Sequence, residues 1–238
     1  MKRLMVFLIF LALPLAAEEG AAILARVDRA RNPMESFSVD VELTSYVNDK
    51  SETSRFRVFG KGSDRSVVEF TYPQSEKGKY LLMLRDAMWI YMPSASRPIR
   101  ISPMQRLMGQ ASNGDVARTS FAVDYNAVAV SEEMLDGREA SVLDLVAKDP
   151  AVAYGKVRLW VDRTSAEPMR ADFYVVSGKL IKRALYREYG EMSGLRVVTK
   201  IEIEDLLRPH NRTVMQYSKL APRQNDDKLF TKDGLGKW

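Results

Sequence analysis

Apolar and polar side chains alternate with a period of two along most of this chain, and that alternation limits the possible folds more than any other feature. Near the start, Phe37, Val39, Val41 and Leu43 are separated from one another by single polar residues. The same pattern returns between residues 195 and 204. Successive side chains of a β-strand point to opposite faces, so this period predicts strands with one buried and one solvated face.

Short turn sequences separate the predicted strands, for example Asp136-Gly137 and Ser193-Gly194. Such pairs favour the tight reversals that join antiparallel neighbours. The strand candidates lie near residues 37–44, 54–61, 65–72, 79–84, 87–92, 126–135, 138–147, 155–162, 168–176, 179–188, 195–204 and 211–219. About a dozen strands without alternating helices predict a mainly β protein built on one antiparallel sheet, and a sheet of that width must curl.

Two helices are expected beside the sheet. Between residues 23 and 30, apolar side chains recur at helical spacing until Asn32 and Pro33 stop the pattern. A second helix is predicted to begin at Ser102, with a proline in its first turn and Gln105 as the partner in a capping box. The polar residues 109–118 that follow are expected to form a loop across an opening.

The first 17 residues have the organisation of a signal peptide, with Lys2 and Arg3 followed by an apolar run. We therefore expect residues 18–238 to form one soluble domain in the periplasm. The chain contains no cysteine, so it has no residue for bacterial N-terminal lipidation and no disulfides. Basic residues exceed acidic ones only slightly and form no block with aromatic side chains, which argues against a nucleic-acid partner.

Catalytic chemistry is poorly represented in the sequence. There is no thiol, the one histidine is His210 in a proline-containing junction, and no serine lies in a nucleophile elbow. Glu132 and Glu133 are adjacent on a predicted strand, so their carboxylates should point to opposite faces instead of converging. We predict that the protein is not an enzyme and has no catalytic residue, metal site or cofactor.

Methionine is abundant, with twelve copies in the chain, five of them between residues 83 and 108. Its flexible side chain suits either ordinary core filling or a surface that accepts ligands of variable shape. A helix laid over a curled sheet would enclose a cavity between the two. The residues predicted to line this cavity and bind acyl chains are Val39, Val41, Phe70, Leu82, Met88, Ile90, Met92, Met104, Leu107 and Met108.

Arg97, Arg100 and Arg106 form a basic cluster in the same part of the chain. The cluster is compatible with a solvated loop. Its functional interpretation is a rim that attracts lipid headgroups or an acidic patch on a partner protein.

The chain resembles the outer-membrane lipoprotein-sorting family, the LolA-like proteins, and is closest to a poorly characterised branch of it. The similarity begins at residues 87–93, with the sequence AMWIYMP, and continues through Arg97, Arg100 and Met108-Gly109. The matching segments after this point are residues 113–115, 124–125, 154–162, 168–173, 178–182, Thr213, Met215, and Phe230-Thr231 with Leu235. Each motif is weak alone, and the resemblance comes from their shared order over nearly all of the chain beyond residue 17.

This resemblance implies a single antiparallel sheet of about 11 strands, curled into an incomplete β-barrel with short helices as a lid. It also implies a periplasmic carrier that takes acyl chains of lipoproteins or lipids from an inner-membrane transporter and passes them to an outer-membrane acceptor. Two alternatives remain at this point: an accessory module that docks to such a transporter without binding lipid, and an envelope hydrolase.

Overall fold

The computed structural model describes residues 13–48, 50–85, 87–117, 120–150, 152–208 and 210–237, without the side chains of residues 13–17 and Arg106. Its strands are β1 (Ser36–Val47), β2 (Lys50–Lys61), β3 (Arg65–Tyr72), β4 (Tyr80–Leu84), β5 (Ala87–Tyr91), β6 (Ile99–Ile101), β7 (Arg106–Met108), β8 (Ala111–Ser112), β9 (Tyr125–Leu135), β10 (Arg138–Ala147), β11 (Lys156–Asp162), β12 (Pro168–Tyr174), β13 (Leu180–Met192), β14 (Leu195–Asp205) and β15 (Arg212–Pro222). Its helices are α1 (Leu13–Arg31), α2 (Asn113–Ala117) and α3 (Phe121–Asp124), with 3-10 turns at Gln74–Glu76 (η1) and Asp227–Phe230 (η2).

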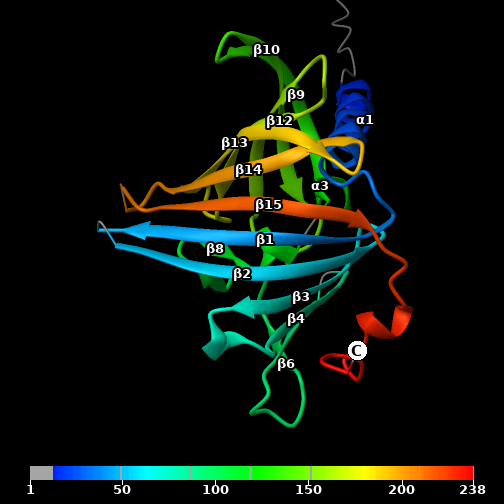
Figure 1. Cartoon of the computed structure of the whole chain (residues 1–238). Coiled ribbons are helices and arrows are strands. Elements are labelled where there is room, and N and C mark those ends of the chain that lie inside the picture. Colours follow the sequence, from blue (N-terminus) through cyan, green and yellow to red (C-terminus); the bar gives the residue numbers. More distant parts are fainter. Residues whose placement is uncertain are drawn as a thin grey trace, which may run out of the picture.

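Thirteen of the strands form one sheet in the order β6-β5-β4-β3-β2-β1-β15-β14-β13-β12-β11-β10-β9. Every neighbouring pair is antiparallel, and β6 and β9 are the two edges, so the curled sheet does not close into a barrel (Figure 1). The predicted fold class is therefore confirmed, although the expected number of about 11 strands was too low. Each of the twelve strand candidates corresponds to a strand of this sheet, and the thirteenth, β6, was missed because its three residues are too few to display an alternation.

The period of two places alternate residues on the inner and outer faces of the curl. In β1 the inward residues Phe37, Val39, Val41 and Leu43 are buried, while the residues between them are half-buried. The inner faces of most strands share one large apolar core. Two smaller clusters occupy the outer face, one on β2–β5 and one on β10–β12.

The N-terminal helix α1 lies against β9, the strand at one edge of the sheet (Figure 1). Leu24 and Val27 bury its apolar side, and a Cβ at Gly20 would lie 2.4 Å from the Cβ of Ala127, so the helix approaches the strand closely. The helix ends at Arg31, before the Asn32-Pro33 pair that was expected to stop it. Of the predicted signal peptide, residues 1–12 lie outside the described residues. No helix in the described part of the chain has a stretch long and apolar enough to cross a membrane.

The chain crosses from one edge of the sheet to the other between β6 and β9. The helix predicted to begin at Ser102 is not formed: Ser102 starts a turn in which its carbonyl accepts from the N–H of Gln105, and a small β7–β8 hairpin follows. Gly109, at the hairpin turn, has a φ of 55°, a left-handed conformation that glycine adopts without strain. The polar loop expected across an opening at residues 109–118 is not observed, since this segment carries β8 and α2 and buries Ala111, Val116 and Ala117 in the core.

The C-terminal segment covers the outer face of β2–β5. Leu229, Phe230 and Leu235 pack there on Phe59 and Leu82. Figure 1 shows this segment leaving β15 and turning beneath the sheet edge near β4. The two faces of these strands are thus covered by different parts of the chain.

Candidate functional site

Two cavities remain inside the curl, of about 70 and 60 Å³. Side chains of β12–β15, α2 and α3 line the first, among them Phe173, Lys182, Ile201, Ile203 and Met215. The second lies nearer the start of β1 and is lined by Val39, Val41, Val58, Val197 and Tyr217. The inner core is therefore incompletely packed in two neighbouring places.

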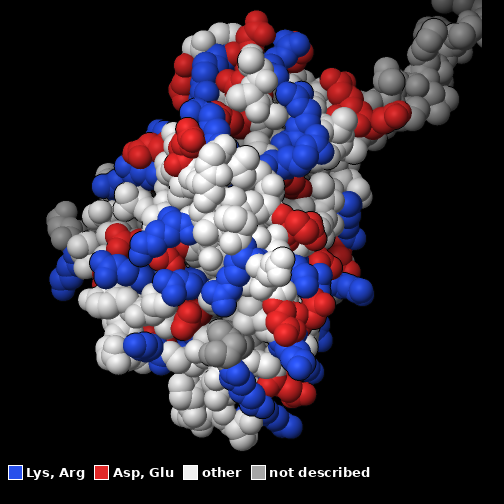
Figure 2. All heavy atoms as spheres, turned by 45° about the vertical axis from the view of Figure 1, so that its right-hand side comes forward, with Lys and Arg blue, Asp and Glu red and all other residues white. Residues whose placement is uncertain are grey.

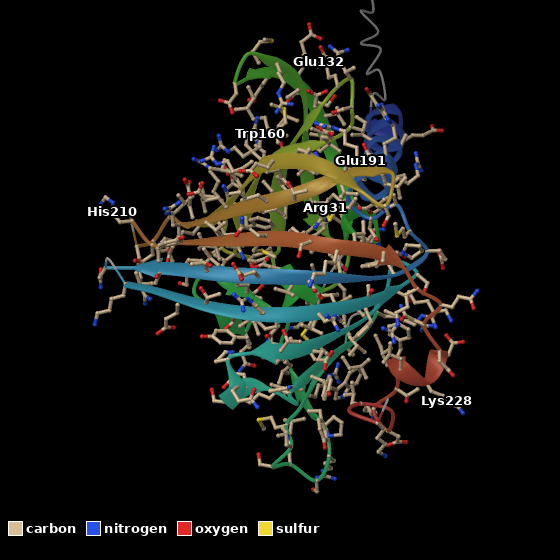
Figure 3. All side chains as sticks on the ribbon, in the orientation of Figure 1. Arg31, Glu132, Trp160, Glu191, His210 and Lys228 are labelled. Atoms are coloured by element: carbon tan, nitrogen blue, oxygen red, sulfur yellow. The ribbon has the colours of Figure 1, made fainter. Side chains whose placement is uncertain are left out.

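Arg31 and Asp115 border both cavities and so separate them. Arg31 is the last residue of α1, and Figure 3 shows it between this helix and strands β14 and β15. Asp115 belongs to α2. The partition between the cavities is thus made of charged side chains from two covering helices, not from the sheet.

Residues 102–117, which we call the interior flap, cover this region from the inner side. The backbone N–H of Gln110 donates to Thr213 Oγ1 (2.8 Å), and Ser66 Oγ donates to the carbonyl of Ala117 (2.8 Å). Ala111, Val116 and Ala117 are buried in the inner core. These contacts and the partly buried side chains of Leu107 and Met108 hold the flap, and its strands β7 and β8 pair only with each other.

The start of α2 is fixed by a reciprocal pair of hydrogen bonds. The backbone N–H of Ser112 donates to Asp115 Oδ2 (2.7 Å), while the backbone N–H of Asp115 donates to Ser112 Oγ (3.3 Å). This is the capping box of a helix, with aspartate as the acidic partner. It orients the Asp115 carboxylate toward the wall of the first cavity.

An interior polar cluster forms where that carboxylate meets β13. Lys182 Nζ donates to Asp115 Oδ2 (2.5 Å) and also contacts the hydroxyl of Tyr154, which lies 3.3 Å from Asp115 Oδ1. The Lys182 and Asp115 side chains are only 7% and 11% exposed. The ammonium group lies 4.5 and 5.2 Å from the rings of Tyr154 and Phe173, so aromatic faces replace part of its water shell.

Burial, followed by the negative charge of Asp115, raises the pKa of Tyr154 well above its ordinary value. The phenol therefore stays protonated and remains a hydrogen-bond donor. The cluster presents an ammonium and a hydroxyl to one carboxylate inside an otherwise apolar chamber.

A second polar contact ties α1 to α3. Asp28 accepts hydrogen bonds from Ser120 Oγ (2.5 Å) and from the backbone N–H groups of Phe121 (2.7 Å) and Ala122 (2.8 Å). The Arg31 guanidinium lies 4.7 Å from the Phe121 ring centre. Burial alone would lower the pKa of Arg31, but Tyr186 and Asp28 outweigh it and raise the pKa, so the group stays charged.

An open groove of about 870 Å³ lies at the β1–β2 hairpin end of the curl. Its lining includes the apolar side chains of Phe56, Phe70, Leu107 and Met108, along with several hydroxyl groups. The flap thus borders the two cavities on one side and this groove on the other.

The structure brings most of the predicted lining residues to the inner face. Val39 and Val41 line the second cavity, and Phe70, Leu107 and Met108 line the groove. Met88 is buried in the same inner core, with Ile90 packed against it.

Three predicted lining residues lie elsewhere. Leu82 points to the outer face, where it packs under the C-terminal segment, because its neighbours Leu81 and Met83 take the inward positions. Met104 is 45% exposed, since the turn at Ser102 replaces the helix that would have directed it inward. Met92 follows β5, is half-buried and lines neither cavity nor groove.

The basic rim predicted around the cavity is not formed by the arginines that the structure describes. Arg97 and Arg100 are exposed, and Arg100 is paired across β5–β6 with Trp89, which packs on the outer cluster. Residues directly opposite on antiparallel strands share a face, so Arg100 belongs to the outer side. The side chain of Arg106 lies outside the described residues.

The carboxylates and the histidine considered for catalysis are far from the cavities. Glu132 pairs with Arg163, and Glu133 accepts a hydrogen bond from Trp160 Nε1 (3.0 Å) on the outer face. Figure 3 shows Glu132 near the β9–β10 hairpin and His210 at the far tip of the β14–β15 connection. Among the described residues, no three histidine, aspartate or glutamate side chains are placed to hold a metal ion.

The polar residues of the interior were not singled out from the sequence, although two signals were present. Ser112 and Asp115 have the spacing of a capping box, which places a helix at 113 instead of 102. Lys182 shares its alternation with Ala184 and Tyr186, so a charged side chain occupies an inward strand position. A lysine on the inner face of a strand requires a charged or hydrogen-bonding partner in the interior. Such a lysine in the sequence therefore indicates a polar site there.

The second cavity is lined by residues at the ends of α1, β15 and the β13–β14 hairpin, including Asn32, Met192 and Leu220. Figure 2 shows this side of the molecule, where uncharged side chains form a surface between groups of basic and acidic residues.

Comparison with known proteins gives close structural relatives. A LolA superfamily protein from Nitrosomonas europaea superposes with a TM-score of 0.85 at 39% identity, over 92% of this chain and 98% of that one. A DUF1329 family protein from Desulfovibrio piger gives 0.80 at 22% identity, over 92% and 99% of the chains. An outer-membrane lipoprotein-sorting protein domain from Vibrio parahaemolyticus gives 0.78 at 19%, over 93% and 100%.

The last two similarities concern the fold alone. A search of curated proteins gave no significant match. A model of a family described as "Uncharacterized protein" matches residues 62–237, most of the chain. The resemblance inferred from the motifs is confirmed: the chain belongs to that family and, through its 39% identical relative, to the LolA superfamily.

Proposed function

We propose that this protein is a periplasmic carrier that binds acyl chains of lipoproteins or lipids inside the curled sheet and shuttles them towards the outer membrane. The observation that carries the proposal is the incompletely packed inner core beneath a weakly attached flap. Membership of the LolA superfamily supports it, and one structure with the same fold is described as a lipoprotein-sorting domain. Residues 1–17 would be removed on export, leaving residues 18–238 as the binding domain.

The cavities of this conformation are too small for an acyl chain. Each measures about 60–70 Å³, whereas an engineered cavity that binds benzene has about 150 Å³ and pockets for larger ligands have about 300–1,000 Å³. This is the closed state, and loading requires that the interior flap move. Displacing α2 would remove the partition at Asp115 and join the two cavities.

The free energy available from a ligand is large enough for that movement. Burying a dozen methylene groups stabilises a complex by about 10 kcal/mol, since each contributes about 0.8 kcal/mol. The fully buried apolar residues of the flap are small (Ala111, Val116 and Ala117), and the larger Leu107 and Met108 are only partly buried against the core. An acyl chain can therefore replace more apolar contact than it displaces.

The proposed activity is binding without chemical conversion, with no catalytic residue and no cofactor. The partners would be an inner-membrane transporter that delivers the ligand and an outer-membrane acceptor that receives it. A docking module that binds a transporter and no lipid is the second candidate, favoured by the small size of the closed cavities.

The deciding measurement is native mass spectrometry of the protein purified from the periplasm, followed by lipid extraction. A carrier should retain a stoichiometric lipid or acylated peptide, whereas a docking module should be empty. The carrier proposal fails if the wild-type protein carries no lipid and binds no apolar probe.

A pair of flap variants sharpens this test with the dye N-phenyl-1-naphthylamine. Met108→Asp places a charge on a half-buried residue packed against the core and should weaken dye binding at least tenfold. Met104→Asp makes the same change on the same flap at an exposed residue and should leave binding unchanged. Equal effects of the two variants would argue against a binding surface beneath the flap.

A further inference from the structure

The carboxylate of Asp115 is inserted into the interior by a segment that also carries apolar side chains. Val116 and Ala117 follow it directly and are buried in the inner core. The inserted segment thus resembles a short amphiphile, with an anionic group beside an apolar stretch. Its anionic end contacts Lys182 and the hydroxyl of Tyr154.

Charge balance in the first cavity depends on this residue. Among the described residues that line this cavity, Arg31 and Lys182 are basic and Asp115 and Asp124 are acidic. When the flap leaves, Asp115 leaves with it and the remaining lining has a net positive charge. The wall residue most affected is Lys182, which is only 7% exposed with the flap in place and loses its carboxylate partner when the flap leaves.

A ligand that fills the space left by the flap covers the Lys182 ammonium again, and a buried ammonium without a partner is strongly unfavourable. A neutral ligand would leave the Lys182 ammonium without a partner, so its complex with the protein would still carry this unfavourable free energy. A ligand with its own negative group would remove it by restoring the ion pair and the hydrogen bond from Tyr154. The interior therefore favours an anionic ligand over a neutral one of equal chain length.

We propose that Asp115 occupies the place of the ligand's anionic group, so that this carrier selects amphiphiles with a carboxylate or phosphate at the end of an acyl chain. Lys182 and Tyr154 bind that group after the flap moves out. The acyl chain then extends along Phe173, Ile201 and Met215, which line the same cavity. The inference rests on the proposed carrier function and adds the chemical class of the ligand.

The test compares probes with the same sixteen-carbon chain by isothermal titration calorimetry. Palmitate carries a carboxylate, 1-palmitoyl lysophosphatidate carries a phosphate, and 1-monopalmitoylglycerol is neutral. In the wild-type protein we expect at least one anionic probe to bind ten times more tightly than the neutral one, a difference of about 1.4 kcal/mol. The two anionic probes distinguish a fatty acid from a phospholipid as the source of the charge.

Two variants assign the preference to the interior polar cluster. Asp115→Asn removes the competing carboxylate and should raise the affinity for the anionic probes several-fold, with little change for the neutral one. Lys182→Met together with Asp115→Asn removes both charges, which avoids leaving one of them buried alone. In this double variant we expect neutral and anionic probes to bind equally.

The outcomes separate this inference from the carrier function. Equal binding of neutral and anionic probes by the wild-type protein overturns the anionic selectivity and leaves the carrier function standing. A preference for anionic probes that survives in the double variant also overturns it, because Lys182 would not be its source. If none of the three probes binds, the carrier function itself fails.

Discussion

The two faces of strands β3–β5 are both apolar and both covered, but the covers are held in different ways. On the outer face, the C-terminal segment is fixed by Asn225, whose amide donates to the carbonyls of Phe37 (2.9 Å) and Gly60 (3.0 Å). Asp227 adds ion pairs with Lys61 and Arg65, each at 2.8 Å. On the inner face, the interior flap has small side chains, cavities beside it and a buried ion pair beneath it.

This difference indicates which cover can move. A cover built from large apolar side chains and backbone-directed hydrogen bonds stabilises the fold itself. A cover built on small residues and a charge pair contributes little net stability, because desolvation offsets the attraction of buried charges. We therefore expect the outer cover to stay fixed and the inner cover to be the one that moves.

The strongest test of the outer cover is Phe230→Ala. Phe230 is buried among Phe59, Leu82 and Leu229, so the truncation should lower the free energy of unfolding by about 3–5 kcal/mol. Urea unfolding followed by circular dichroism measures this change. Binding of N-phenyl-1-naphthylamine per folded molecule should not change, because the side chain is on the face opposite the cavities.

Val176→Ala provides the control, since Val176 is 89% exposed and its truncation should leave stability within about 0.5 kcal/mol of wild type. If Phe230→Ala altered dye affinity as strongly as stability, the two covers would be coupled and the contrast between them would be wrong.

The outer and inner faces also differ in how each holds a buried carboxylate. Asp172 faces outward and accepts hydrogen bonds from Arg183 Nε (2.7 Å) and from Arg170, whereas Asp115 faces inward and pairs with one lysine. Burial alone would raise the pKa of Asp172, but the two arginines outweigh it and hold the pKa below its ordinary value of 3.8. Asp172 should therefore be a structural anion that stays ionised whether or not the flap is in place.

Asp172→Asn should lower the free energy of unfolding at pH 7 by about 2–3 kcal/mol, less than for a fully buried pair because both arginines are partly exposed. A depressed pKa in the folded state contributes stability above the unfolded pKa, and this stability is lost as pH falls through the folded value. The gap between wild type and variant in urea unfolding should thus be constant from pH 7 to about 5 and narrow below pH 4. A gap that widened on acidification would contradict this assignment.

The sequence predicted the long strands well because each carries its own alternation, which depends only on neighbours along the chain. Leu82 was assigned to the wrong face for the same reason: residues 80–84 are all apolar, so no polar partner marks the outward side. The flap was missed because a two-residue strand and a five-residue helix have no period to detect. Their positions depend on contacts with Thr213 and Ser66, which are distant in sequence.

The interior flap should be easier to displace than the C-terminal segment on the outer face. Gly109→Ala tests this with only a small expected loss of stability. Gly109 has a φ of 55°, and a Cβ there would lie 2.2 Å from Ser45 Oγ and 2.4 Å from Thr213 Oγ1. The added methyl group must push the flap away from β1 and β15. We expect a stability loss of about 1–2 kcal/mol and a several-fold gain in dye affinity, because part of the flap's closing free energy is lost.

Gly137→Ala separates the clash from the backbone strain, because Gly137 has a φ of 75° but its Cβ would meet nothing within 4 Å. Both variants carry the unfavourable left-handed conformation, at about 1 kcal/mol, yet only the first displaces the flap. Dye affinity should therefore rise in Gly109→Ala and remain at the wild-type value in Gly137→Ala. An unchanged affinity in both would mean that the flap stays in place when its anchor is disturbed, and the inner cover would then be as fixed as the outer one.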